Sequence, residues 1–366
     1  MRIAQIAPLY ESVPPQGYGG TERVVSYLTE KLVDLGHDVT LYASADSDTR
    51  ARRIGGTPKA LRLSGFQGDP LIPHYLMLEQ VFAAADRFDI IHSHVDILGL
   101  PFARRGSVPV VTTLHGRLDL EDLVPLYGEY AEQAVVSISD SQREPIPQAR
   151  WVGTVHHGLP ADLYRFHPEP GRYLAFIGRV SPEKRLDRAI EIAVRARRPL
   201  KIAAKVDPVD RKYFRKEIEP LLNHKLIEWI GEVDDRAKDE FLGGAAALLF
   251  PIDWPEPFGL TMIESMACGT PVIAWQHGSV AEVLEHGVTG FLCDDIGAAV
   301  RAVGRLDRLS RQVCREVFET RFTADRMARD YLSIYAALIR ARRAAGASIR
   351  TPGGAFRPET APIREH

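Results

Sequence analysis

Two glutamates separated by seven residues are the most informative chemical feature of this chain. Glu256 and Glu264 bound the stretch Glu-Pro-Phe-Gly-Leu-Thr-Met-Ile-Glu. Prolines on both sides of Glu256 favour extended backbone there, because the residue before a proline is disfavoured in the α region. Gly259 then begins a predicted helix, whose free N–H groups and dipole favour an anion. This arrangement fits a ligand with a central phosphate and hydroxyl-bearing rings on both sides, such as a nucleotide sugar.

A pair of carboxylates could also catalyse glycoside hydrolysis, where the two carboxyl groups lie about 5–9.5 Å apart. Eight residues of helix rise about 12 Å, so the spacing argues against a hydrolytic pair. For a donor lying along the helix start, we expect Glu256 near the sugar and Glu264 near the ribose hydroxyls. The main-chain N–H groups of Phe258, Gly259 and Leu260 would bind between them.

Two basic residues, Arg179 and Lys184, follow a predicted strand at residues 173–177. A cation at a helix start is unfavourable relative to the helix dipole, which indicates that an anion belongs there. Arginine and lysine can stabilise the charge that develops on a nucleoside diphosphate leaving group. We therefore expect this pair to stand in for a metal ion and predict no metal site.

Glycines and a histidine follow two strands of the first half. Gly19 and Gly20 precede the first predicted helix and would let the backbone approach a phosphate or sugar, while Thr21 is a candidate helix cap. The spacing is not that of a dinucleotide-binding loop. His115 follows a predicted strand at 108–114, at the sheet edge where such folds bind ligands.

Four other histidines are more ambiguous. His92 and His94 lie at a strand end and could line the acceptor side, and a zinc site that combines them with Asp96 is a disfavoured alternative. His156 and His157 lie in a loop near the expected domain boundary. The role of all four histidines stays open.

Together these motifs resemble glycosyltransferase family 4. The resemblance covers residues 1–340 and includes Gly-Gly-Thr-Glu at 19–22, Thr-Leu-His-Gly at 113–116, Gly-Arg-Val-Ser-Pro-Glu-Lys at 178–184, the two-glutamate stretch at 256–264 and Cys-Gly-Thr-Pro-Val-Ile at 268–273. It implies retaining transfer of a hexose from a nucleotide diphosphate sugar to an acceptor hydroxyl. It also implies that His115 contacts the donor sugar near the reacting carbon. His157 departs from the family, which often has Asn-Gly at this place.

The resemblance gives each site residue a role. Glu256 would hold and polarise the sugar, and Arg179 with Lys184 would stabilise the diphosphate. The sequence offers no evident nucleophile, which suits a same-face attack in which the leaving phosphate accepts the acceptor's proton. UDP-glucose is the first-choice donor and GDP-mannose the second, since no residue separates the two bases.

Two other classes of function remain open. An epimerase or phosphorylase on the same architecture would show phosphate-dependent turnover without an acceptor. A non-catalytic nucleotide-sugar-binding protein is disfavoured, because both glutamates and both basic residues are present.

The elements that must position these residues form two series of predicted strands. Short apolar runs alternate with helices, which predicts an α/β protein with two Rossmann-like, doubly wound domains facing across a cleft, the GT-B architecture. The strands are expected at residues 3–7, 38–43, 89–92, 108–114, 134–138 and 151–156, and then at 173–177, 200–204, 226–230, 246–251, 271–274 and 290–293.

We place an N-terminal acceptor-side domain at 1–162 and a C-terminal domain that binds the nucleotide sugar at 163–322. A final helix is expected at 323–340, and in the family such a helix crosses back onto the first domain. Residues 341–366 have little apolar content and are expected to form a disordered tail.

Composition limits the classes of function. The chain has 366 residues and a formal net charge of −2, which gives no reason to expect nucleic acid as a partner. Its three cysteines are widely spaced, as is typical of a reducing cytoplasm, and no apolar run approaches the ~20 residues that span a bilayer. We expect a cytoplasmic enzyme without stable membrane insertion. The acceptor, the linkage and the oligomeric state stay open.

Overall fold

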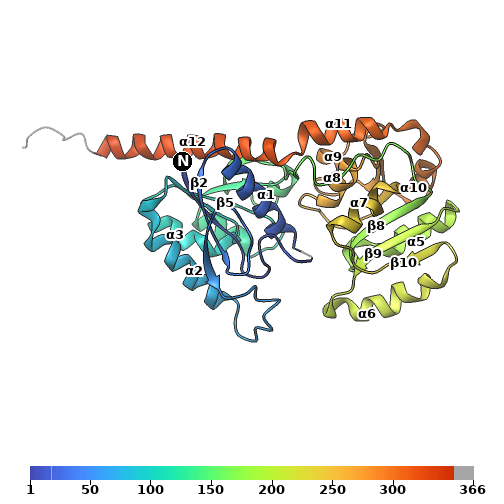
Figure 1. Ribbon diagram of the computed structural model, residues 1–366, viewed down its shortest axis with the longest axis horizontal. Coiled ribbons are helices and arrows are strands. Elements are labelled where there is room, and N and C mark those ends of the chain that lie inside the picture. Colours follow the sequence, from blue (N-terminus) through green and yellow to red (C-terminus); the bar gives the residue numbers. More distant parts are fainter. Residues whose placement is uncertain (18, 350–366) are drawn as a thin grey trace, which may run out of the picture.

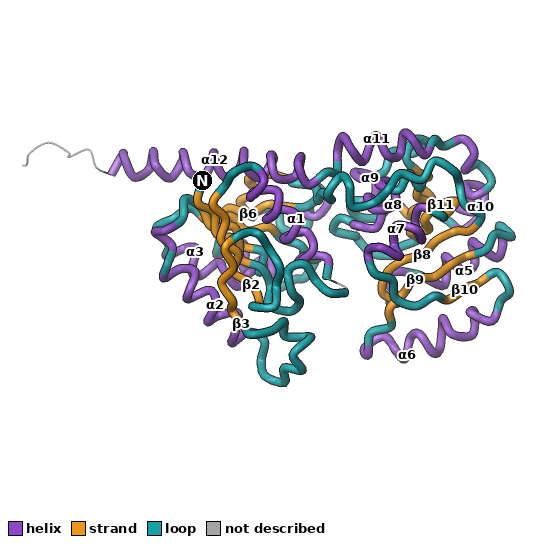
Figure 2. The backbone as a smooth tube through the Cα atoms, viewed as in Figure 1, coloured by secondary structure: helices purple, strands orange, loops and turns teal. Residues whose placement is uncertain are grey.

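The computed structural model describes residues 1–17 and 19–349, and it contains two parallel α/β sheets (Figures 1 and 2). The first sheet has seven strands in the order β3-β2-β1-β4-β5-β6-β7, and the second has six in the order β10-β9-β8-β11-β12-β13. In each sheet the order reverses direction beside the first strand of its series, between β1 and β4 and between β8 and β11. Ligands bind at such switch points in open α/β sheets. The predicted fold class is confirmed.

The first sheet is formed by short strands connected mainly by helices. Its strands are β1 Arg2–Ile6, β2 Asp38–Ser44, β3 Arg52–Thr57, β4 Ile90–Ser93, β5 Val110–Thr113, β6 Ala134–Ser137 and β7 Arg150–Thr154. Its helices are α1 Gly20–Asp34, α2 Leu71–Ala83, α3 Leu100–Arg105 and α4 Leu123–Glu129.

Strand β3 is the one strand of this sheet that the sequence analysis missed. It lies at the sheet edge and reads Arg-Arg-Ile-Gly-Gly-Thr, without the continuous apolar run of a strand buried on both faces. An edge strand pairs on one side alone, so its sequence carries a weaker signal.

The second sheet repeats the pattern. Its strands are β8 Tyr173–Arg179, β9 Leu200–Lys205, β10 Ile227–Trp229, β11 Ala245–Phe250, β12 Val272–Trp275 and β13 Gly290–Cys293. Its helices are α5 Leu186–Arg195, α6 Arg211–Tyr213, α7 Asp235–Gly243, α8 Leu260–Ala267, α9 Val280–Val283, α10 Ile296–Val303 and α11 Arg311–Arg321. The position of the domain boundary within the connection from β7 to β8 remains a prediction.

The starts of two helices decide where the site lies. Helix α8 begins directly after Gly259, which has φ +78°, so the expected helix start is confirmed. Helix α1 begins at Gly20, after an extended Gly19. Thr21 is therefore the second residue of the helix, and its predicted role as a cap is wrong. The polypeptide enters this helix through glycine backbone, without a side-chain cap.

The last helix, α12 Ala324–Ile349, returns to the first sheet (Figure 1). Met327, Tyr331 and Tyr335 are buried in the same hydrophobic core as the apolar residues of β1 and α1. The helix does not end at 340, so residues 341–349, which we expected in a disordered tail, are helical. Their alanines and arginines favour helix and continue a turn that is already packed. Residues 350–366 of the expected tail lie outside the described chain.

Within the part of the chain that the structure describes, no helix combines the length and the apolar character needed to cross a membrane.

Candidate functional site

The glycine loop of the first half and the start of α8 in the second half lie against each other. A Cβ atom added to Gly20 would lie 3.6 Å from Leu260 Cδ1, and Leu260 packs against the hydrophobic cores of both sheets. A Cβ atom at Gly19 would come within 2.8 Å of Pro15, so this position has no room for a side chain. Three predicted donor-binding residues are therefore brought together across the two sheets.

Glu256 lies between β11 and α8 and is 9% exposed. Trp254 donates its indole N–H to Glu256 Oε2 over 3.0 Å, and the Lys184 ammonium forms an ion pair with the same oxygen. The predicted catalytic residues Lys184 and Glu256 thus meet, although 72 positions separate them in the chain. Sequence reasoning missed Trp254, whose indole N–H, two residues before the carboxylate, was the available signal.

A loop after β12 holds the backbone of Glu256. Ser279 donates its N–H to the Glu256 carbonyl over 3.0 Å and its hydroxyl to the Phe258 carbonyl over 2.9 Å. Gly278 has φ +57°, and a Cβ atom there would lie 2.4 Å from Glu256 N. The close approach of the two loops requires glycine at this position. Neither Gly278 nor Ser279 was among the predicted site residues.

Arg179, at the end of β8, contacts a separate group of acidic side chains. It donates to Glu183 over 2.6 Å, and its guanidinium lies 3.6 Å from Asp210 and 3.9 Å from Asp207. The two predicted diphosphate ligands, Arg179 and Lys184, therefore contact different carboxylates. The sequence analysis did not foresee that internal acidic groups would balance both cations.

Glu264 is buried in α8 at 2% exposure. Its Oε1 accepts from Lys238 Nζ over 2.8 Å and from the Tyr164 hydroxyl over 3.4 Å. Its Oε2 is buried and has no hydrogen-bond partner among the described residues. One oxygen thus fixes the side chain while the other remains a free acceptor. Lys238 and Tyr164, which come from separate segments, were not predicted.

His115 connects β5 to the start of α8 through stacked rings. Its ring lies over His157 with 5.3 Å between centroids, and His157 packs edge-on against Phe258 at 4.9 Å. Burial lowers the pKa of His115 to about 3, so its imidazole is neutral at physiological pH. The Nδ1 atoms of His115 and His157 are buried without a partner among the described residues.

The sequence left open whether His92 and His94 line the acceptor side, and the structure buries both side chains. They are 0% and 1% exposed, and their ring nitrogens bond to protein groups: His92 to Tyr335 and Thr113, and His94 to Gln5 and His115. The sequence pattern placed them at a strand end but did not show that α12 packs against His92. Among residues 1–17 and 19–349, no group of three potential ligands is arranged to hold a metal ion.

A narrow pocket lies between the two halves beside Glu256. It is lined by residues 117–119 and 255–257, together with Ser141, Gln142 and Pro145. Residues 117–119, shortly after His115, therefore face the loop that carries Glu256. His156 lies in the same interface, 3.3 Å from Glu282.

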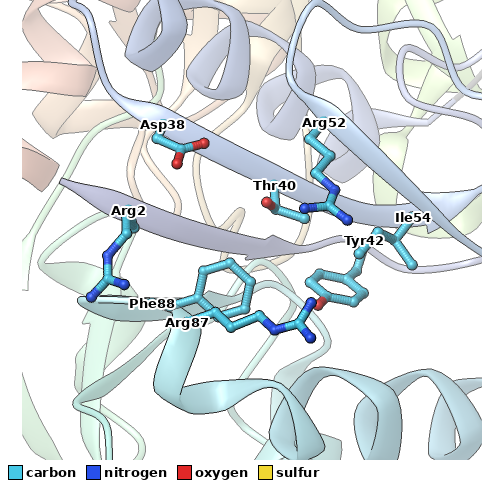
Figure 3. A pocket seen from close by; sticks show the side chains of 8 residues that line it. All are labelled: Arg2, Asp38, Thr40, Tyr42, Arg52, Ile54, Arg87 and Phe88. Carbon is cyan, nitrogen blue, oxygen red and sulfur yellow. The ribbon is translucent and has the colours of Figure 1, made fainter.

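A separate pocket of about 90 Å³ lies on the first sheet (Figure 3). Its walls come from the early parts of β1, β2 and β3 and from the turn before β4. This pocket lies away from the carboxyl ends of the strands and shares no residue with the site described above. Its lining residues are Arg2, Asp38, Thr40, Tyr42, Arg52, Ile54, Arg87 and Phe88.

Two protein-family models match successive parts of the chain. The model described as Glycosyltransferase Family 4 matches residues 18–145, and the model described as Glycosyl transferases group 1 matches residues 165–312. Among curated proteins, the chain is 26% identical over 390 aligned positions to a phosphatidyl-myo-inositol mannosyltransferase of Mycolicibacterium smegmatis, covering 99% of each.

Solved structures share the fold. AviGT4, a glycosyltransferase involved in avilamycin A biosynthesis, matches with a TM-score of 0.71 and 22% identity over 93% of this chain and 98% of that one. Anabaena HepE in complex with UDP and glucose matches with a TM-score of 0.72 and 16% identity over 92% of this chain and 99% of that one.

Proposed function

The chain belongs to glycosyltransferase family 4 and transfers a sugar from a nucleotide sugar, and from that premise we propose that its donor is UDP-glucose. As in this family of retaining hexosyltransferases, the transferred hexose keeps its anomeric configuration. Residues 163–322 bind the donor, because Arg179, Lys184, Glu256 and Glu264 all lie there. Residues 1–162 bind the acceptor and contribute Gly19, Gly20 and His115 to the donor.

The observation that supports sugar transfer at this site is the position of the Glu256 carboxylate. Lys184 and Trp254 hold it at the amino end of α8, and it faces the segment after His115. A fixed carboxylate stabilises the positive charge that grows on the anomeric carbon in the transition state. The N–H groups of the first turn of α8 and the cations Arg179 and Lys184 stabilise the departing diphosphate.

The ion pair between Lys184 and Glu256 also implies that the diphosphate binds Lys184 before Glu256 contacts the sugar. A diphosphate that binds Lys184 draws the ammonium from Glu256, which leaves the carboxylate free to contact the sugar. The leaving phosphate then accepts the proton of the acceptor hydroxyl, so the reaction needs no enzymic nucleophile. Glu264 binds the ribose with Oε2, the oxygen that Lys238 leaves unoccupied.

The choice of base and sugar rests on comparison alone. HepE was solved with UDP and glucose, whereas the Mycolicibacterium smegmatis relative is a mannosyltransferase. GDP-mannose is therefore the second candidate donor.

A donor panel tests the proposal. UDP-glucose, UDP-galactose, ADP-glucose and GDP-mannose are incubated with the full chain and pooled acceptor alcohols, and released nucleoside diphosphate is measured. UDP release from UDP-glucose that depends on acceptor is expected, and it should be lost in Glu256→Ala but kept in Glu79→Ala, an exposed α2 carboxylate. Faster release from GDP-mannose would overturn the donor assignment. Turnover that needs phosphate but no acceptor would indicate a phosphorylase.

A further inference from the structure

The proposed contact between His115 and the donor sugar depends on which ring nitrogen of His115 carries the proton. We propose that His94 is a positioning residue that fixes His115 as a hydrogen-bond acceptor at Nδ1, for a hydroxyl of the bound sugar. This inference rests on the proposed function, and it adds a defined tautomer and the residues that set it.

The tautomer follows from a chain of hydrogen bonds that begins at Gln5. The amide nitrogen of Gln5 donates to the Tyr335 hydroxyl over 3.2 Å, and its carbonyl oxygen lies 2.8 Å from His94 Nε2. A carbonyl oxygen can only accept, so His94 Nε2 carries a hydrogen and donates it. In a neutral His94 ring, Nδ1 is then a lone-pair acceptor.

The next bond transfers this assignment to His115. His94 Nδ1 lies 2.9 Å from His115 Nε2, and since His94 Nδ1 accepts, His115 Nε2 must donate. In a neutral His115, Nδ1 therefore has a lone pair and no proton. This atom is buried without a partner in the described chain, and a buried acceptor without a donor is costly.

A second series of hydrogen bonds, which also begins at Gln5, is consistent with these donor and acceptor assignments. Tyr335 accepts from Gln5, so its own hydroxyl proton is available for His92 Nδ1, which lies 2.6 Å away. His92 Nε2 then donates to Thr113 Oγ1 over 2.7 Å, and Thr113 lies 2.9 Å from the Tyr331 hydroxyl. Tyr331 and Tyr335 of helix α12 thus complete a hydrogen-bond network in which His92, His94 and His115 each carry one ring proton.

Burial keeps these rings neutral. Burial in the core lowers the pKa of His92 and of His94 well below the ordinary histidine value, and neighbouring imidazoles lower it further. The His157 ring stacks on the His115 ring with 5.3 Å between centroids, and His115 Nδ1 is buried, so a sugar hydroxyl reaches that atom only after the surroundings of the two rings rearrange. His157 belongs to the connection between the two sheets, where a change in their relative position would move it.

Histidine tautomers can be measured directly. In the full chain labelled with ¹⁵N-histidine, long-range ¹H–¹⁵N correlation at pH 7.5 should show His115 with a protonated Nε2 and an unprotonated Nδ1. The His115 signals are assigned by their loss in His115→Gln. A protonated Nδ1, a tautomer mixture or an imidazolium at His115 in the unsubstituted chain would overturn the inference.

Variants separate positioning from mere packing. His94→Leu removes the partner of His115 Nε2 and should shift the His115 signals and lower kcat/KM for the donor about threefold to tenfold, the scale of one neutral hydrogen bond. His94→Asn retains an acceptor near the place of Nδ1 and should restore both. His74→Gln is the matched control, because His74 is another buried histidine and bonds to Leu9 instead. It should change thermal stability alone.

The outcomes distinguish this inference from the proposed function. Unchanged kcat/KM in a folded His115→Ala variant would remove the proposed sugar contact, whatever the tautomer. If His94→Leu does not fold, the spectrum of the unsubstituted chain still decides the tautomer.

Discussion

At the scale of single residues, the two glutamates are held by side chains and not by helix-end amides. Glu256 contacts Lys184 and Trp254, and Glu264 contacts Lys238 and Tyr164. A carboxylate that served to cap a helix would accept from backbone N–H groups. The contacts of both glutamates among the described residues therefore favour a role in ligand binding. Because the two carboxylates have different partners, kinetic measurements on single variants can distinguish their roles.

We expect the two glutamate variants to differ in kinetics. If Glu264 binds ribose equally in the ground and transition states, Glu264→Ala should raise the KM for the donor with little change in kcat. Glu256→Ala should lower kcat by about 10²–10³, because its interaction strengthens as the anomeric carbon gains charge. Thermal melts control for folding. An unchanged kcat in folded Glu256→Ala would contradict the assigned role.

The cations Arg179 and Lys184 predict that transfer survives a chelator. We expect them to supply positive charge at the diphosphate, the task that a divalent metal performs in other transferases. Initial rates in EDTA should equal those in buffer, and Lys184→Met should lose most activity under both conditions. Loss of activity in EDTA that Mg²⁺ or Mn²⁺ restores would refute the prediction.

At the scale of elements, loops at the carboxyl ends of strands position the site by close contact. Gly278 and Ser279 follow β12 and fix the loop between β11 and α8 through its backbone. In the first sheet, Tyr335 and Tyr331 of α12 bond to His92 at the end of β4 and to Thr113 at the end of β5. Each functional side chain thus depends on a segment distant in sequence.

Gly278→Ala should damage the site through the backbone of Glu256. The added Cβ would lie 2.4 Å from both Glu256 N and O, at a φ that L-residues rarely adopt. We expect a stability loss of about 1–3 kcal/mol and a fall in kcat. Gly128→Ala is the matched control, since a Cβ there meets no atom within 4 Å. Equal activity of the two variants would disprove the bracing role.

The buried histidines should make the chain sensitive to mild acid. Burial depresses the pKa of His92, His94, His115 and His157 in the folded state, so below about pH 6.5 the unfolded chain binds protons that the folded chain does not. Stability therefore falls as pH drops, by about 1 kcal/mol per neutral histidine between pH 6.5 and 5.5. Denaturation midpoints at these two pH values measure the effect, which should be smaller in His94→Leu. A midpoint independent of pH in this range would contradict it.

At the scale of the whole molecule, a few polar contacts join the two halves beside the site. Glu282 of α9 accepts from the N–H groups of Asp140 and Ser141, each over 2.7 Å. Arg23 of α1 forms an ion pair with Asp235 of α7. These contacts join the two sheets next to the pocket beside Glu256, which Ser141 also lines.

Glu282→Gln should loosen this connection at neutral pH. Although burial alone would raise the pKa of Glu282, hydrogen bonds from His156, Ser141 and Asp140 lower it below the ordinary 4.5. The stabilisation is therefore present above the pKa of the unfolded chain and is lost as pH falls through the lower, folded-state pKa. We expect a cost of about 1–3 kcal/mol at pH 7, the scale of hydrogen bonds to a charged group. The difference between variant and parent melting temperatures should shrink below pH 4.5, and a constant difference would count against this account.

The sequence by itself determined the properties that depend on neighbouring residues: most of the strands and the candidate site residues. Apolar runs of strand length gave both sheets except β3, and short motifs at strand ends gave Arg179, Lys184, Glu256 and Glu264 as candidates. Only the tertiary structure decided which partners these residues have, Lys184 with Glu256 and Lys238 with Glu264, and that His92 is buried against α12. The physical reason is that strand order and helix packing decide which distant segments meet, whereas a local pattern reports only the backbone and burial preferences of its own residues.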